Sequence, residues 1–89
     1  MPSQVVTVAS TVGLHARPAS LLIKAASAAG VPVTIGRVGE AAVNAASMLS
    51  VLALGAKHGE ELEITVDDAP NAQEILASLV DIVGTNHDG

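Results

Sequence analysis

The sequence predicts an α+β fold, an open-faced two-layer sandwich with the element order βαββαβα. Four short segments either alternate apolar and polar residues or are rich in β-branched residues, which is typical of strands. Three other segments combine helix-capping residues with apolar residues at helical spacing. Because each predicted helix has one apolar face, we expect a four-stranded antiparallel sheet with all three helices on one face and water on the other.

The first strand and the first helix come from the N-terminal third of the chain. Residues 4–8, "QVVTV", form a short β-branched segment that favours a strand. Residues 16–29 are predicted to form a helix, because Pro18 suits the first turn and Gly30 suits the C-terminal end. The apolar face of this helix is expected to comprise Ala19, Leu22, Ile23 and Ala26.

Two strands and a short helix are predicted next. Apolar residues alternate in residues 31–37, "VPVTIGR", and residues 40–45, "EAAVNA", are expected to return as a short strand after a glycine-containing turn. Residues 47–54, "SMLSVLAL", are predicted to form a helix of about two turns. Either Asn44 or Ser47 is expected to cap it, and a glycine ends it.

The C-terminal third contains the last strand and the last helix. Residues 61–66, "ELEITV", alternate regularly, which predicts a strand with one buried face. The last helix is expected to have Asp68 or Asn71 as its cap and to end at Gly84. Its apolar face is expected to comprise Leu76, Leu79, Val80 and Val83.

Length, composition and charge limit the classes of function. A chain of 89 residues predicts one small domain, residues 1–89. The sequence has no Phe, Tyr or Trp, so it has no aromatic side chain to stack on nucleic-acid bases. Its formal net charge of -5 opposes binding to phosphate backbones and anionic lipids. We therefore expect neither nucleic acid nor a membrane as a partner.

The sequence also lacks the features of secreted proteins and of metal sites. Cysteine is absent, and "MPSQVVTVAS" has neither the basic opening nor the apolar run of a signal peptide. No segment approaches the ~20 apolar residues that span a bilayer, so we expect a cytoplasmic protein. His58 and His87 lack the spacing and neighbouring carboxylates of a zinc site, so both are expected to be exposed. No metal and no cofactor is expected.

The stretch "GLHARPAS", residues 13–20, places His15 just before the first predicted helix. Backbone N–H groups of a first helical turn are unpaired, and the helix dipole favours a negative charge there. Arg17 adds planar donors suited to phosphate oxygens, and an ordinary imidazole is mostly neutral at pH 7 and hence nucleophilic. The stretch indicates a histidine that accepts a phosphoryl group. The alternative is a histidine that only caps the helix or lies on the surface.

"GLHARPAS" together with "VNAASMLSVLALGAKHGEELEI" resembles HPr, the family of histidine-containing phosphocarriers of the bacterial sugar phosphotransferase system. The resemblance implies the same βαββαβα sandwich. It also implies that Gly13, Leu14, His15, Arg17 and Pro18 form the active-site motif, and that His15 carries the phosphoryl group on its Nδ1 atom.

The resemblance further implies the partners. Phosphoenolpyruvate would supply the phosphoryl group through enzyme I, and the A domains of sugar-specific enzymes II would receive it. Ser47 matches the regulatory serine at the start of the second helix of the family, so a serine kinase or phosphorylase would act on it; the simpler interpretation is a helix N-cap. Met48, Leu49 and Leu52 are the candidates for a docking surface, although helical geometry favours core packing for at least one of them.

Two positions depart from the family pattern, and two other functions remain open. Val12 replaces a residue that is often polar, and Ala46 replaces a lysine that commonly precedes the regulatory serine. One alternative is a non-catalytic regulatory or binding module in which His15 only caps a helix. The other is a phosphocarrier of a nitrogen-type or dihydroxyacetone-type branch, with the same histidine and different partners. In each case we expect a monomer.

Overall fold

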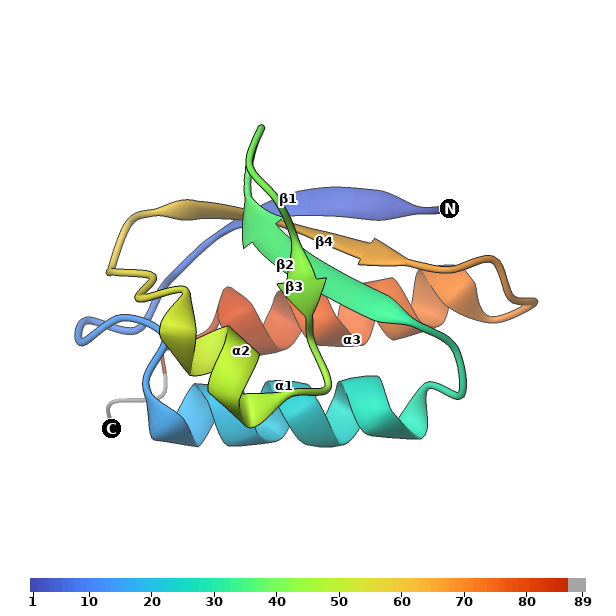
Figure 1. Ribbon diagram of the computed structural model, residues 1–89, viewed down its shortest axis with the longest axis horizontal. Coiled ribbons are helices and arrows are strands. Elements are labelled where there is room, and N and C mark those ends of the chain that lie inside the picture. Colours follow the sequence, from blue (N-terminus) through green and yellow to red (C-terminus); the bar gives the residue numbers. More distant parts are fainter. Residues whose placement is uncertain (87–89) are drawn as a thin grey trace.

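The computed structural model describes residues 1–86, and its elements follow the predicted order (Figure 1). The expectation for His87 lies outside the described residues. The elements are β1 (Ser3–Thr7), α1 (Ala16–Ala28), β2 (Val33–Arg37), β3 (Val43–Asn44), α2 (Met48–Ala53), β4 (Glu61–Val66) and α3 (Ala72–Val83).

The sheet has four strands in the order β1-β4-β2-β3, and every neighbouring pair is antiparallel. β4 occupies an interior position, where Ile64 faces Gln4 of β1 on one side and Ile35 of β2 on the other. The alternation read in "ELEITV" is confirmed, because Leu62, Ile64 and Val66 are fully buried. One face of β4 therefore belongs to the core.

The helices cover one face of the sheet, as predicted. Figure 1 shows α1 and α3 side by side beneath the sheet, and within residues 1–86 no helix lies on the opposite face. Leu22 of α1 and Leu79 of α3 are fully buried between the layers. The predicted apolar faces are confirmed except at their margins, where Ile23 and Val80 are only partly buried against the core. Within the described residues, aliphatic side chains therefore form the hydrophobic core between the two layers.

Several element ends differ from the predictions. β3 is only two residues long, because the Asn44 side chain accepts a hydrogen bond from the Ala46 N–H (2.9 Å) and turns the chain toward α2. Ser47, rather than Asn44, is the N-cap of α2, and its Oγ accepts from the Ser50 N–H at 3.3 Å. Asn71 stands at the N-cap of α3 without a side-chain cap hydrogen bond, so the predicted capping role is wrong in that respect.

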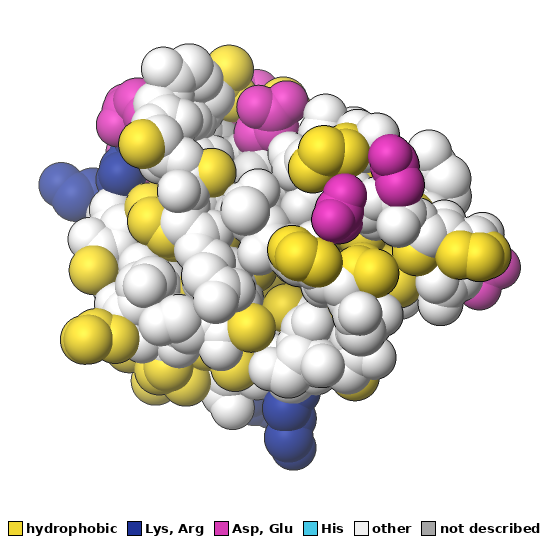
Figure 2. Space-filling model, turned by 45° about the vertical axis from the view of Figure 1, so that its right-hand side comes forward, with side chains coloured by type: hydrophobic (Ala, Val, Ile, Leu, Met, Phe, Trp, Pro, Cys, Tyr) yellow, Lys and Arg dark blue, Asp and Glu magenta, His cyan; other side chains and the backbone are white. Residues whose placement is uncertain are grey.

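Charged side chains are spread over the face in Figure 2. Acidic side chains lie at the upper left, at the top and over the right half, whereas Lys and Arg side chains lie at the left and lower edges. Apolar and uncharged side chains fill the space between them. No helix within residues 1–86 is long and apolar enough to cross a membrane.

Candidate functional site

His15 is the N-cap residue of α1, at the end of the loop that leaves β1. Its backbone is extended (φ -93°, ψ -172°), and its carbonyl accepts from the Ala19 N–H at 3.0 Å. The side chain makes no cap hydrogen bond. The ring is half-buried, and its Nε2 atom is enclosed by protein. The histidine is therefore held at the positive end of the α1 dipole, as predicted.

The loop before His15 needs its glycine. Gly13 has φ +82°, in the left-handed region, and its N–H donates to the Ser10 carbonyl at 2.9 Å. A Cβ atom at Gly13 would lie 2.5 Å from the Ala56 carbonyl oxygen. Leu14 is buried, and its N–H donates to the same Ala56 oxygen at 2.9 Å. Gly13 and Leu14 thus seat the loop against a distant segment, so their place in the predicted motif has a structural reason.

The first turn of α1 carries the rest of the motif. Arg17 is exposed, and no acidic residue lies in the first turn to compete for its charge. Pro18 is buried and has no N–H, so the ring fills space in the core without removing a helical hydrogen bond. The first turn therefore presents backbone N–H groups and one exposed guanidinium next to His15, which is an arrangement suited to an anion.

A second segment contacts this loop, and sequence reasoning missed it. The Nδ1 atom of His58 lies 3.1 Å from the Ser10 carbonyl oxygen, although the residue is exposed as predicted. The Gly59 N–H donates to the Val8 carbonyl at 3.0 Å, and the Val8 N–H donates to the Glu60 carbonyl at 2.9 Å. The sequence shows residues 57–60 only as a polar turn, and no local pattern indicates what they contact.

The predicted docking residues lie on α2, which packs against α1. Met48, Leu49 and Leu52 are 38%, 82% and 39% exposed. The expectation that at least one of them packs in the core is wrong, since Val51 is the buried residue of this helix. Figure 1 shows α2 near the end of α1 that begins after His15.

Ser47 is half-buried at the start of α2, with its Oγ accepting from Ser50 as described above. The two departures from the family pattern differ in exposure. Ala46 is partly buried against the core, whereas Val12 is 70% exposed. At position 46 the chain therefore has a methyl group that packs against the core instead of a long charged side chain.

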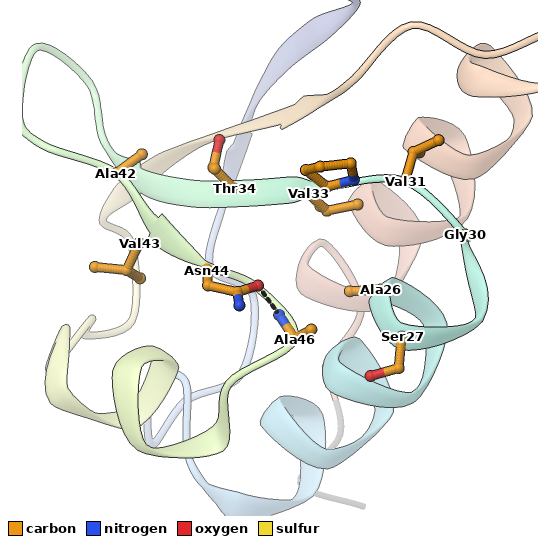
Figure 3. A pocket seen from close by; sticks show the side chains of 11 residues that line it. Ala26, Ser27, Gly30, Val31, Val33, Thr34, Ala42, Val43, Asn44 and Ala46 are labelled. Carbon is orange, nitrogen blue, oxygen red and sulfur yellow. Dashed lines mark hydrogen bonds between the residues drawn. The ribbon is translucent and has the colours of Figure 1, made fainter.

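A groove of about 500 Å³ lies elsewhere, between the C-terminal end of α1, β2 and β3. Figure 3 shows Ala26 and Ser27 on one side of it and Thr34, Val43 and Asn44 on the other. His15 precedes the opposite end of α1, so this groove is separate from the site. Within residues 1–86, no group of three or more His, Cys, Asp or Glu side chains is placed to hold a metal ion.

Comparison with known proteins identifies the family. The family model described as "PTS HPr component phosphorylation site" matches residues 2–85. This chain belongs to the HPr family. It is 54% identical to the phosphocarrier protein HPr of Streptomyces coelicolor over 71 residues, which are 80% of this chain and 75% of that protein.

Solved HPr-family structures share the fold. The HPr of Bacillus anthracis superimposes with a TM-score of 0.82 at 30% identity, covering 92% of this chain and 95% of that one. Crh of Bacillus subtilis, a catabolite-repression protein solved as a swapped dimer, gives a TM-score of 0.71 at 30% identity and covers 97% of each chain. The protein is accordingly an HPr phosphocarrier of the phosphotransferase system, with the α+β sandwich of that family.

Proposed function

We propose that His15 accepts a phosphoryl group from phosphorylated enzyme I, which phosphoenolpyruvate supplies, and passes it to the A domains of sugar-specific enzymes II. The observation that carries the proposal is the placement of the His15 ring. It lies at the N-terminus of α1 with Nε2 enclosed and without a cap hydrogen bond. A ring that only capped the helix would use a nitrogen to accept from the first turn. Enclosure of Nε2 favours Nδ1 as the atom that reacts.

The transfer needs only a neutral imidazole. The lone pair of Nδ1 attacks phosphorus and a P–N bond forms, while the bond between phosphorus and the donor atom of enzyme I breaks with its electron pair left on that atom. If His15 keeps its proton on the other ring nitrogen, that proton does not have to move. His15 then holds its proton on the enclosed Nε2 atom. The same steps in reverse transfer the phosphoryl group from His15 to the next partner.

Arg17 stabilises the charge that arrives on His15. Its guanidinium stands in the first turn of α1, where backbone N–H groups also point toward an incoming anion. Because the side chain is exposed, contact with phosphate oxygens costs less desolvation than it would for a buried ion pair. Gly13, Leu14 and Pro18 have a different role in the proposal, since they fix the backbone on either side of the ring.

Intact-mass spectrometry tests the reacting residue. The protein is incubated with enzyme I, magnesium and phosphoenolpyruvate, and its mass is compared with that of His15→Ala. One acid-labile phosphoryl adduct on the wild type and none on the folded variant is the expected result, because the loop residue contributes little to the core. No adduct on the folded wild type would contradict the proposal and favour the binding module. An adduct on His15→Ala would move the reaction to another residue.

The same assay run as a time course tests Arg17. Arg17→Ala is expected to slow the transfer about 100- to 1,000-fold, as loss of one charge-stabilising donor does. Lys24→Ala is the matched control, because Lys24 is also exposed on α1 but about two turns further on. Equal rates for the two variants would remove Arg17 from the mechanism.

We propose further that a serine kinase phosphorylates Ser47 and that a phosphorylase removes the phosphate. We also propose that Met48, Leu49 and Leu52 dock enzyme I. The three side chains are exposed and lie one, two and five positions after Ser47 in the chain. A phosphate on Ser47 would add a charge of about -1.5 to -2 beside this apolar surface. The helix N-terminus tolerates that charge, whereas a docked partner would have to desolvate it.

Calorimetry on two substitutions tests this regulation. Ser47→Asp is expected to weaken binding of enzyme I up to about fivefold, the range of one exposed charge. Ser47→Asn is the matched control, because asparagine is an equally good N-cap without the charge. Equal affinities of the two variants would contradict the proposed charge effect.

We also propose that the protein acts as a monomer in the cytoplasm. The phosphoryl acceptor has to remain accessible to one partner after another, which favours a freely diffusing single chain. Sedimentation at the working concentration tests the oligomeric state, and a dimer would contradict the proposal.

A further inference from the structure

Two loops that are distant in sequence are joined beside His15. We call residues 8–15 the histidine loop and residues 55–60 the supporting loop. The Leu14 N–H donates to the Ala56 carbonyl at 2.9 Å, and the His58 Nδ1 atom lies 3.1 Å from the Ser10 carbonyl oxygen. Figure 1 shows the two loops side by side at the end of the molecule where α1 begins. The backbone that enters His15 is therefore held from the supporting loop.

An ion pair fixes the supporting loop to the sheet. Arg37, the last residue of β2, donates from Nε to Glu60 Oε1 at 3.2 Å and from Nη2 to Glu60 Oε2 at 3.0 Å. Arg37 Nη2 also lies 3.4 Å from the Gly55 carbonyl oxygen, and the Lys57 N–H donates to Glu60 Oε2 at 2.5 Å. Two parallel N–H···O bonds constrain direction as well as distance. Both ends of the supporting loop thus contact a single guanidinium on a rigid strand.

The contact between His58 and Ser10 defines which ring nitrogen of His58 carries a hydrogen. A carbonyl oxygen only accepts hydrogen bonds, so the Nδ1 atom that faces Ser10 has to carry the hydrogen. The same Ser10 carbonyl accepts from the Gly13 N–H at 2.9 Å. His58 therefore donates to the oxygen that closes the Ser10–Gly13 turn immediately before His15.

We infer that Arg37, Glu60 and His58 are positioning residues for phosphoryl transfer at His15, acting through the supporting loop and the histidine loop. The inference rests on the proposed function of His15. Displacement of Ala56 or His58 would shift Leu14 and the turn at Gly13, and with them the ring that follows. A displacement of about 1 Å at a reacting group can slow a reaction as much as 100-fold. None of the three residues has to touch the phosphate.

Amide hydrogen exchange tests the mechanical part of the inference. Glu60→Gln is expected to speed exchange of the Leu14 amide, because the acceptor Ala56 is no longer held, while amides in α3 keep their rates. Glu63→Gln is the matched control. Glu63 lies on β4, three positions after Glu60, and its side chain accepts a hydrogen bond from Ser3 Oγ. Unchanged exchange at Leu14 in folded Glu60→Gln would overturn the inference for the ion pair.

Kinetics of phosphoryl transfer test the catalytic part. With enzyme I as donor, Glu60→Gln is expected to lower kcat about tenfold and leave KM nearly unchanged, since the exposed docking residues are untouched. Phosphoramidate, a small donor that needs no docking, should show the same slowing. Arg37→Lys keeps the charge without the paired donors and should behave like Glu60→Gln. Rates equal to those of Glu63→Gln would overturn the inference.

His58 gives a test that is independent of the ion pair and of folding, because its side chain is exposed. His58→Ala is expected to slow transfer, and His58→Asn to restore it, because an asparagine amide N–H can replace the donor at Nδ1. Equal rates for His58→Ala and the wild type would overturn the role of His58. Failure of the wild type itself to accept phosphate would refute the proposed function instead, so the two failures are distinguishable.

Discussion

At the scale of single residues, the motif "GLHARP" combines groups that act on the ligand with groups that shape the backbone. His15 and Arg17 supply the nucleophile and the charge in the proposed reaction. Gly13 supplies a left-handed backbone with φ +82° and leaves room for the Ala56 carbonyl. A side chain at this position would meet both a conformational and a steric obstacle.

Alanine substitutions at Gly13 and Gly30 distinguish the conformational cost from the steric cost. Gly30 also has positive φ (+76°), but nothing lies within 4 Å of a Cβ built there. Gly30→Ala is therefore expected to lower the free energy of unfolding by about 1–2 kcal/mol, the conformational cost alone. Gly13→Ala should lose about 1–3 kcal/mol more through the clash with Ala56. Denaturant unfolding measures both, and equal losses would show that the contact with Ala56 is not constraining.

Residue chemistry visible in the sequence was sufficient to predict the candidate nucleophile but not its surroundings. A histidine before a helix, followed by an arginine, is a local pattern, and the structure places His15 at the helix N-cap as expected. The contact between His58 and Ser10 spans 48 positions, so no spacing rule in the sequence could indicate it. The spacing around His58 does not indicate a metal ligand, and only the structure shows its contact with the histidine loop.

At the scale of elements, α2 and the supporting loop show where local patterns mislead. Apolar residues in "SMLSVLAL" suggest a helix with a core-facing side, yet Val51 alone is buried and Met48, Leu49 and Leu52 face water. In a six-residue helix the number of buried positions depends on how the element sits on its neighbours rather than on its periodicity. Exposure of three large apolar side chains is what a docking surface requires.

The ion pair of the supporting loop makes stability depend on pH. The hydrogen bond from Arg37, and after it the one from the Lys57 N–H, hold the pKa of Glu60 below its ordinary value of 4.5, against a smaller opposing effect of burial. The same pair raises the pKa of Arg37. Because the folded-state pKa of Glu60 is lowered, its stabilisation is present above the unfolded-state pKa and is lost as pH falls through the folded-state pKa.

Melting temperatures of the wild type and Glu60→Gln as a function of pH test this linkage. The wild type is expected to melt at a higher temperature near neutral pH, and the difference should shrink once the pH falls below 4.5, where Glu60 takes up a proton. Other carboxylates titrate in both proteins and largely cancel in the difference. A difference that stays constant down to strongly acid pH would contradict the assignment to Glu60.

At the scale of the whole molecule, the order of elements and the layering follow from patterns with short range. Strand alternation in "ELEITV" and the apolar faces of α1 and α3 each require burial on one side, and a single sheet covered by helices satisfies all of them together. Lack of aromatic residues does not prevent this, because Val, Ile, Leu and Ala fill the space between the layers. The fold class was therefore predictable without knowledge of any contact.

The sequence by itself determined the fold class, the strand and helix positions to within a few residues, and the candidate nucleophile at the head of a helix. Only the tertiary structure decided which side chains of α2 face water, why position 13 has to be glycine, and how Arg37 and Glu60 hold the supporting loop. The physical reason is the separation in sequence between the residues that interact. Periodicity and capping depend on neighbours within one or two turns, whereas the pairing of Arg37 with Glu60 joins groups 23 positions apart and exists only after the sheet has brought the end of β2 beside the start of β4.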